Sequence, residues 1–226
     1  MKISIILPVL NEETHISQIL SAIPISDREE LIVVDGGSRD RTVSFAAEFT
    51  KNVFMTRRGR GHQMNFGAER AGGEILLFLH ADCWLPDNAF RAIRQVLSNT
   101  EISAGAFDLV IDHPSIWFRI IEIGANFRSR MTSVPYGDQG VFMRKEVFLA
   151  VGGFPDIPLM EDIAMARELK KRGKISFIRS PIRTSPRRWL KEGPIYTTLR
   201  DWTLAVSYSV FNVSPKRLQR FYRDVR

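Results

Sequence analysis

Two apolar stretches decide the fold of this 226-residue chain: Lys2-Ile-Ser-Ile-Ile-Leu7 and Leu31-Ile-Val-Val-Asp35. Each is short, continuous and rich in β-branched residues, and the first ends at Pro8 and the second at Gly36-Gly37. A continuous apolar run indicates a strand that is buried on both faces, as in a parallel sheet. Residues 12–22 between them place apolar side chains at helical spacing, which predicts a strand, a helix and a second strand.

The same alternation continues along the chain. Further strands are predicted at residues 53–55, 75–79, 103–111, 139–143 and 174–178, and further helices at 40–50, 62–71, 86–98, 114–130 and 160–172. This order predicts an α/β fold with a parallel sheet, whose ligands bind at the carboxyl ends of the strands. Those ends carry Asn11-Glu12, Asp35 to Ser38, and His80 to Asp82.

Composition limits the class of protein. With 44% hydrophobic and 25% charged residues, the chain is typical of a soluble globular domain. The single cysteine, Cys83, excludes an internal disulfide and favours a reducing, cytoplasmic setting. The apolar N-terminus is interpreted as a strand rather than a signal peptide. The uncharged run 202–215 is shorter than the roughly 20 residues that a membrane span needs.

The net charge of +7 lies entirely in the C-terminal tail. Residues 1–182 carry 22 Lys and Arg against 22 Asp and Glu, whereas residues 183–226 carry 10 against 3. A neutral body with a basic tail differs from a uniformly basic nucleic-acid binder, and no recognition motif is present. We therefore expect no nucleic-acid partner.

Five motifs give the chain a family resemblance. They are Ile-Leu-Pro-Val-Leu-Asn-Glu-Glu (6–13), Val-Val-Asp-Gly-Gly-Ser-Arg-Asp-Arg-Thr (33–42), Gly72-Gly73-Glu74 leading into Leu79-His80-Ala81-Asp82, Gly137-Asp138-Gln139-Gly140, and Gly152-Gly153-Phe154 followed by Glu161-Asp162. In this order they resemble the family-2 glycosyltransferases with the GT-A fold, over about residues 3–180. Residues 58–65 with 79–82 are similar to a bacterial subgroup associated with radical-SAM and selenium genes.

The resemblance implies a domain organisation. A mixed, mostly parallel sheet flanked by helices is expected within residues 1–182. The nucleotide-binding half would be at about 1–100 and the acceptor half at about 101–182. Residues 183–226 would form a helical basic tail.

The resemblance also implies where a nucleotide-sugar donor binds. Asp35 corresponds to the position that holds the nucleoside, with Pro8, Asn11 and Glu12 packed beside it. A carboxylate there can accept hydrogen bonds from a uracil N–H or a ribose hydroxyl. The alternative is that Asp35 begins a turn, because Asp and Gly are favoured at such junctions.

His80-Ala81-Asp82 lies where the family has an Asp-x-Asp motif that holds a divalent cation on the donor diphosphate. Asp82 matches the metal ligand, and Mn²⁺ and Mg²⁺ prefer oxygen ligands. His80 departs from the motif, so it is either a second ligand or a neutral histidine that lines the nucleotide site with Ala81.

The basic segment that follows residue 56 suits phosphate oxygens, because guanidinium groups form bidentate contacts with them. We expect Arg58 and Arg60 to contact the donor. Family members commonly have a basic–Asn–x–Gly pattern here, which Asn65 and Gly67 match, whereas Met64 stands at the basic position. The alternative is a solvated loop.

The acidic pair Glu161-Asp162 matches the family's catalytic pair. Asp162 would be the general base that takes the proton of the acceptor hydroxyl, and Glu161 would line the acceptor site. Acidic residues are also favoured in the first turn of a helix without any catalysis. Asp138 and Gln139 are expected to line the acceptor site, or to belong to an ordinary turn.

Arg187-Arg188-Trp189 partly resembles the Gln-x-x-Arg-Trp motif of processive family members, with Ser185 at the Gln position. Either Arg187 or Arg188 can stabilise the leaving diphosphate.

These assignments predict an inverting glycosyltransferase that uses a nucleotide-diphosphate sugar, by default UDP-linked, and a divalent cation, Mn²⁺ or Mg²⁺. The alternative is a GT-A module that binds nucleotide sugars without turnover, which His80 favours. A glycosidase is disfavoured, because it has no use for a diphosphate-binding loop.

The tail has its own alternatives. Residues 194–211 form an apolar helical stripe between two groups of cations, and residues 215–224 predict a second helix. This pattern is typical of a segment on an anionic membrane surface, in which case the acceptor is a lipid or another apolar alcohol. The stripe can equally cover the sheet or pair with a second subunit as a homodimer.

Overall fold

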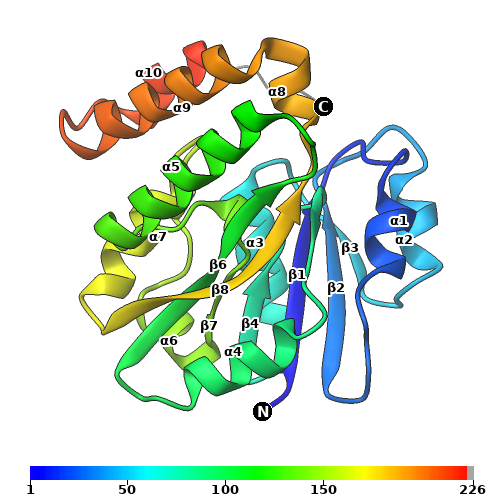
Figure 1. The fold of residues 1–226 in the computed structure, drawn as a ribbon. Coiled ribbons are helices and arrows are strands. Elements are labelled where there is room, and N and C mark those ends of the chain that lie inside the picture. The colour runs from blue at the N-terminus through cyan, green and yellow to red at the C-terminus, as the bar shows by residue number, and fades with distance from the viewer. Residues whose placement is uncertain (223–226) are drawn as a thin grey trace.

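Eight strands form one central sheet in the part of the chain that the computed structural model describes, residues 1–222 (Figure 1). Their order across the sheet is β3-β2-β1-β4-β7-β6-β8-β5. The strands are β1 (Ile3–Val9), β2 (Glu29–Asp35), β3 (Val53–Met55), β4 (Ile75–Phe78), β5 (Cys83–Trp84), β6 (Ile102–Ile111), β7 (Val141–Arg144) and β8 (Lys174–Thr184).

The parallel part of the sheet confirms the prediction from the two opening stretches. Strand β1 pairs in parallel with β2 on one side and β4 on the other, and β2 pairs in parallel with β3. Strand β7 is antiparallel to β4 and β6, so the sheet is mixed. The carboxyl ends of β1 and β2 meet where Val9 lies opposite Asp35.

Helices cover both faces of this sheet (Figure 1). They are α1 (Ile16–Ser21), α2 (Thr42–Ala47), α3 (Arg60–Arg70), α4 (Ala89–Leu97), α5 (Ile116–Thr132), α6 (Lys145–Ala150), α7 (Glu161–Lys170), α8 (Arg187–Glu192), α9 (Pro194–Ser209) and α10 (Pro215–Leu218), with short 3₁₀ helices at Gly137–Gln139 and Gln219–Phe221. No helix among the described residues combines the length and the apolar character that a membrane crossing requires.

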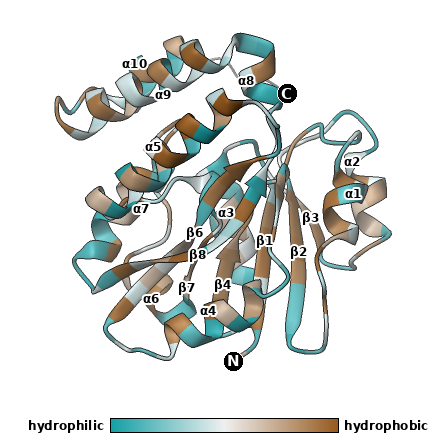
Figure 2. Ribbon diagram, in the orientation of Figure 1, coloured by the Kyte–Doolittle hydropathy of each residue, from teal (hydrophilic) through white to brown (hydrophobic). Residues whose placement is uncertain are grey.

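The core lies on both sides of β1, because its successive side chains point to opposite faces. Ile3 and Ile5 pack with α1, α2 and α4, whereas Ile6 packs with α3, α6 and α7. Figure 2 shows hydrophobic residues along the central strands. The sheet therefore holds the strand ends, and the loops that follow them, in fixed positions.

Three short elements were not predicted: β5, α6 and α8. Strand β8 also continues to Thr184, well past the predicted end at residue 178. This extension was not predicted because it contains Pro181, and proline is rare inside strands. It is tolerated here since the pairing of β6 with β8 shifts register between Phe107 and Leu109, in the region of Pro181.

The tail forms α8, α9 and α10. One side of α9 packs on the domain, where Leu204 meets Leu159 and Leu218. The predicted second tail helix, 215–224, is present as α10 and the 3₁₀ turn up to Phe221, and its last two residues lie outside the described residues. Two of the tail cations, Arg223 and Arg226, also lie outside them.

Candidate active site

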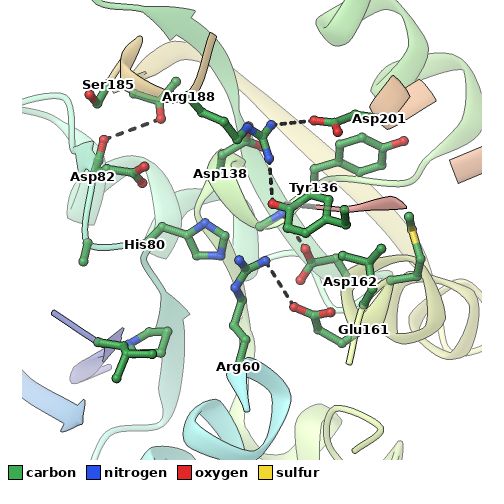
Figure 3. A pocket seen from close by; sticks show the side chains of 18 of the residues that line it. Arg60, His80, Asp82, Tyr136, Asp138, Glu161, Asp162, Ser185, Arg188 and Asp201 are labelled. Atoms are coloured by element: carbon green, nitrogen blue, oxygen red, sulfur yellow. Dashed lines mark hydrogen bonds and ion pairs between the residues drawn. The ribbon is translucent and has the colours of Figure 1, made fainter. Parts of the chain in front are cut away.

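A cavity of about 180 Å³ lies at the carboxyl ends of β1 and β4, between the turn before β7, the start of α7 and the tail (Figure 3). It brings together most of the residues predicted to form the site. They are Pro8, Glu12, Arg60, His80, Ala81, Asp82, Asp138, Glu161, Asp162, Arg187 and Arg188.

Arg187 joins three parts of the chain at one side of this cavity. Its two terminal nitrogens donate to the two carboxylate oxygens of Glu12 at 2.6 and 2.7 Å. Nη2 also lies 3.4 Å from Oδ2 of Asp82. A planar guanidinium suits such bidentate pairing with a carboxylate. The tail is therefore tied to the loops that follow β1 and β4.

Asp82 fits a divalent cation that is shared with a diphosphate. Its side chain is 27% exposed and lines the cavity. Mg²⁺ in such sites takes one or two carboxylates, and phosphate oxygens supply further ligands. Within residues 1–222, no three His, Cys, Asp or Glu side chains gather to hold a metal ion by themselves. Asp82 could thus supply one carboxylate ligand to such an ion.

Gly137 separates His80 from Asp162. A Cβ atom on Gly137 would lie 2.4 Å from Nε2 of His80 and 2.8 Å from Oδ2 of Asp162, so no larger residue fits. The Gly137 N–H donates to Oδ2 of Asp162 at 2.9 Å. Asp162 belongs to the first turn of α7, which follows Met160 in a left-handed conformation (φ 70°). The turn and the helix start together fix the position of this carboxylate.

Burial raises the pKa of Asp162 to about 7, and the nearby charge of Glu161 acts in the same direction. The charge of Arg60 and the N–H of Gly137 oppose this shift. Arg60 lies 3.3 Å from Glu161, which is itself only 3% exposed. A carboxylate with a pKa near 7 is well suited to take a proton at neutral pH.

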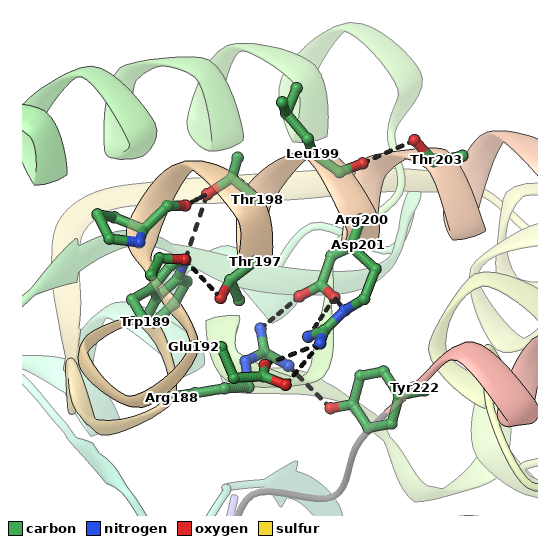
Figure 4. Close-up of polar contacts among 12 residues, drawn as sticks. Arg188, Trp189, Glu192, Thr197, Thr198, Leu199, Arg200, Asp201, Thr203 and Tyr222 are labelled. Carbon is green, nitrogen blue, oxygen red and sulfur yellow. Dashed lines mark hydrogen bonds and ion pairs between the residues drawn. The ribbon is translucent and has the colours of Figure 1, made fainter.

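Arg188 is held by the tail rather than by the sheet (Figures 3 and 4). Its guanidinium lies 2.7 Å from Oδ2 of Asp201 and donates to the Tyr222 hydroxyl at 2.8 Å. Burial raises the pKa of Asp138, whereas the charges of Arg188 and Arg128 lower it. This side of the cavity is thus lined by acids and by an arginine whose position depends on α9.

Two of the predicted nucleoside residues do not line the cavity. The Asp35 carboxylate is fully buried and accepts the N–H groups of Gly37 and Ser38, both at 2.8 Å, and the hydroxyl of Ser38. The Asn11 side chain accepts the N–H of Arg39 at 2.9 Å. Both side chains hold the loops after β1 and β2 in shape.

Asn65, Gln139 and Arg58 also lie outside the main cavity. Asn65 exchanges two hydrogen bonds of 2.8 Å with the main chain of Phe154. Gln139 accepts the hydroxyl of Ser129 at 2.8 Å and donates to the main chain of β6 at 3.1 Å. The side chain of Arg58 is exposed. Asn65 and Gln139 therefore connect loops and elements around the site.

Tyr136, Asp201 and Tyr222 are among the lining residues of the cavity that were not predicted from the sequence. Asp201 had a usable signal. Arg200 and Asp201 are the only charged residues between Glu192 and Lys216, and an isolated charged pair in an apolar helix indicates a buried polar contact.

The fold defines a class of protein. A mixed, mostly parallel sheet between helices matches the structures of glycosyltransferases with the GT-A fold. The family Glycosyl transferase family 2 matches residues 4–153, which is more than half of the chain. The chain belongs to this family.

Known proteins share parts of the chain. It is 28% identical over 173 residues to 4,4'-diaponeurosporenoate glycosyltransferase of Staphylococcus haemolyticus, an alignment that covers 66% of this chain and 46% of the relative. The chain spans less than half the length of the curated relatives that it matches.

Two solved structures share the fold at low sequence identity. The mannosyltransferase PcManGT from Pyrobaculum calidifontis, in complex with GDP-Man and Mn²⁺, has a TM-score of 0.68 at 19% identity, covering 97% of this chain and 67% of that one. TarS of S. aureus, residues 1–349, in complex with UDP-GlcNAc, has a TM-score of 0.65 at 16% identity, covering 98% and 70%.

Proposed function

We propose that this chain is an inverting glycosyltransferase that moves a sugar from a nucleotide-diphosphate sugar, with UDP as the default nucleotide, to an acceptor hydroxyl. One observation carries the proposal: Asp162, with a pKa near 7, shares a cavity with Asp82 and Arg187. Figure 3 places Asp82 and Asp162 on opposite sides of His80. The nucleotide sugars bound to the two similar structures support the donor class.

The step is a single displacement. The acceptor oxygen forms a bond to the anomeric carbon while the bond from that carbon to the diphosphate oxygen breaks, and the electron pair leaves with the diphosphate. Asp162 takes the proton of the acceptor hydroxyl, and the anomeric configuration inverts. Gly137 holds the carboxylate oxygen for this transfer through its N–H.

The donor side of the proposal uses the predicted residues in two ways. Pro8, Glu12, Arg60, His80 and Ala81 line the cavity and contact the donor directly. Asn11 and Arg58 lie in loops, Asp35 ends β2 and Asn65 lies on α3, and we propose that the nucleoside and phosphates bind next to these residues. Asp82 would hold a divalent cation, which neutralises charge on the diphosphate when bound.

Arg187 and Arg188 stabilise the leaving diphosphate in this proposal. Arg187 can do so once the donor replaces its contact with Glu12. Preorganised cations next to developing negative charge are effective because the site excludes water.

The acceptor side consists of Asp138 and Glu161, with Gln139 behind them. A second cavity of about 40 Å³ between α5 and α9 shares Asp138 and Arg188 with the main one and reaches Trp202. We include in the proposal an acceptor hydroxyl carried by a lipid or another apolar alcohol, a cytoplasmic setting, and membership of the radical-SAM-associated subgroup.

Nucleotide binding and donor turnover test the proposal together. Thermal unfolding is measured with UDP-GlcNAc or GDP-Man, with Mn²⁺ or with EDTA, for the wild type and Asp82→Ala. A ligand at a hundred times its dissociation constant adds about 2.7 kcal/mol of stability. We expect Asp82→Ala to weaken donor binding only when Mn²⁺ is present. Equal weakening in EDTA would remove Asp82 from the metal site.

The non-catalytic alternative makes a different prediction. A module that only binds nucleotide sugars would show the thermal shift but no release of nucleotide diphosphate from the donor in Mn²⁺. Release that is lost in Asp162→Asn supports the transferase.

A further inference from the structure

Helix α5 exposes a row of large apolar side chains. Its members recur at steps of four, three, four and four residues along one side of the helix, and each is between 55% and 70% exposed. They are Ile116, Ile120, Ile123, Phe127 and Met131. The sequence analysis did not single out this row.

Helix α9 exposes a second row at the same spacing, which continues one residue past its end. These side chains are between 39% and 65% exposed. They are Ile195, Leu199, Trp202, Val206 and Val210. The charged residues of α9, Arg200 and Asp201, pair with each other on the inner side. The outer side of α9 therefore carries no charge.

The two rows lie side by side and form one surface, which we call the α5–α9 face. A Cβ atom on Gly124 of α5 would lie 3.2 Å from the Trp202 ring of α9, so the helices touch there. Figure 2 shows hydrophobic residues on both helices. Each row spans 15 residue steps, or roughly 22 Å, so the face extends along the whole length of both helices. Large contiguous apolar surfaces of this kind often mark interaction sites.

Charge decides between a bilayer and a second copy of the chain. Exposed cations stand before and after α9, at Lys191, Lys216, Arg217 and Arg220, and none of them has an ion-pair partner within residues 1–222. A second copy would bring two segments of the same +7 charge together, whereas an anionic bilayer attracts cations near its surface.

We infer that the α5–α9 face lies on an anionic bilayer surface, with its apolar rows in the headgroup region and the flanking cations on acidic lipids. Amphipathic helices bind in this way, through apolar area together with attraction to anionic headgroups. The inference extends the earlier tail hypothesis, because α5 of the domain body supplies half of the face.

Vesicle sedimentation tests the inference with the full chain. Vesicles of phosphatidylcholine alone are compared with vesicles in which roughly 40% of the lipid is the anionic phosphatidylglycerol. Both kinds are measured at low and at high salt. We expect binding to the acidic vesicles that falls with salt. Phe127→Glu on α5 and Leu199→Glu on α9 should each weaken this binding at least tenfold. Leu149→Glu, at an exposed apolar position of α6 outside the face, is the matched control and should bind as the wild type does.

Several outcomes would overturn the inference. These are no binding to acidic vesicles at low salt, full binding by both face variants, or a stable dimer in sedimentation velocity that both variants abolish. The last result would assign the face to a second copy. Unchanged melting temperatures show that the variants fold. A double variant, Lys216→Ala with Arg217→Ala, tests the contribution of charge to vesicle binding without changing the apolar rows. Nucleotide binding is measured without vesicles, so a failure of the proposed function is seen separately.

Discussion

The turn after β2 and the start of α7 each contain a carboxylate that was predicted to act at the site, and their surroundings differ. Asp35 accepts hydrogen bonds from two N–H groups and one hydroxyl of its own turn. Asp162 accepts one N–H and lies beside the negative charge of Glu161. Local donors favour the ionised form of a carboxylate, whereas burial and a like charge favour the protonated form.

The two carboxylates illustrate a difference between the N-terminal and C-terminal halves of the chain. The N-terminal half uses polar side chains to fix the loops after β1 and β2, and most of their hydrogen-bonding capacity is already used. The C-terminal half leaves acids and arginines around a cavity, where burial and the charge of Glu161 raise the pKa of Asp162. Rigid loops on one side and ionisable groups on the other suit the proposed transfer, in which a large donor is positioned against one general base.

The largest expected effect is on turnover. Asp162→Asn should lower kcat by about two to four orders of magnitude, the usual contribution of a general base, while donor binding stays near the wild-type value. Asp35→Asn should lower kcat less than tenfold. Both are measured by release of nucleotide diphosphate. Wild-type turnover in Asp162→Asn would show that the two carboxylates do not differ as proposed.

The second effect is on pH dependence. Because the pKa of Asp162 is raised to about 7, kcat/KM should rise about tenfold per pH unit below 7 and level off above it. Stability should change in the opposite direction. The folded protein keeps a proton on Asp162 up to about pH 7, whereas the unfolded chain releases it near pH 4. The contribution of Asp162 to the free energy of unfolding is therefore lost as pH rises from about 4 to about 7.

Asp162→Asn provides the control for both curves. The variant should lack this part of the stability loss, seen as a smaller change of melting temperature between pH 5 and pH 8. If the rate profile of the wild type is flat across pH 7, Asp162 does not titrate in the free enzyme.

A smaller effect is expected where the two halves are joined. Arg187→Met leaves the carboxylate of Glu12, only 4% exposed, without its bidentate partner. A buried acceptor that loses its partner costs about 1–3 kcal/mol. Chemical denaturation should show this loss, and adding Glu12→Gln should recover part of it. If Arg187→Met is as stable as the wild type, the pair does not hold the tail.

The smallest effect concerns the turn after β2. Asp35→Asn keeps one amide carbonyl oxygen as an acceptor for the N–H groups of Gly37 and Ser38, so stability should fall by about 1 kcal/mol. Donor affinity, measured by titration calorimetry, separates the two interpretations of Asp35. A loss of more than tenfold in affinity would indicate direct contact with the nucleoside.

The central strands were predictable because burial on both faces leaves a continuous apolar run. Strand β1, paired in parallel on both sides, is the clearest case. Strand β5 is two residues long and exists only because it pairs with the end of β8 at Thr184. No local pattern encodes such a pairing, and the same holds for the end of β8 beyond Pro181.

The site was predictable to the level of motifs, but not of contacts. Asp-Gly-Gly-Ser at 35–38 is the pattern of a nucleoside site and equally of a hydrogen-bonded turn, so spacing alone does not separate them. Three residues of the family motifs, Asp82, Asp138 and Asp162, line one cavity, and their roles there stay predictions. The bridge from Arg187 to Glu12 depends on residues that are far apart in the sequence and have no shared periodicity.

That bridge also sets an order of events during synthesis. Glu12 and Arg187 are 175 positions apart. At about 5–20 residues per second, the ribosome adds Arg187 roughly 9–35 s after Glu12. Closing so long a loop is entropically costly until the strands between the two residues are in place. The parallel strands β1 to β4 are therefore synthesised long before Arg187. Strand β8 ends at Thr184, shortly before Arg187, so the last strand of the sheet and the bridge to Glu12 become available at nearly the same time.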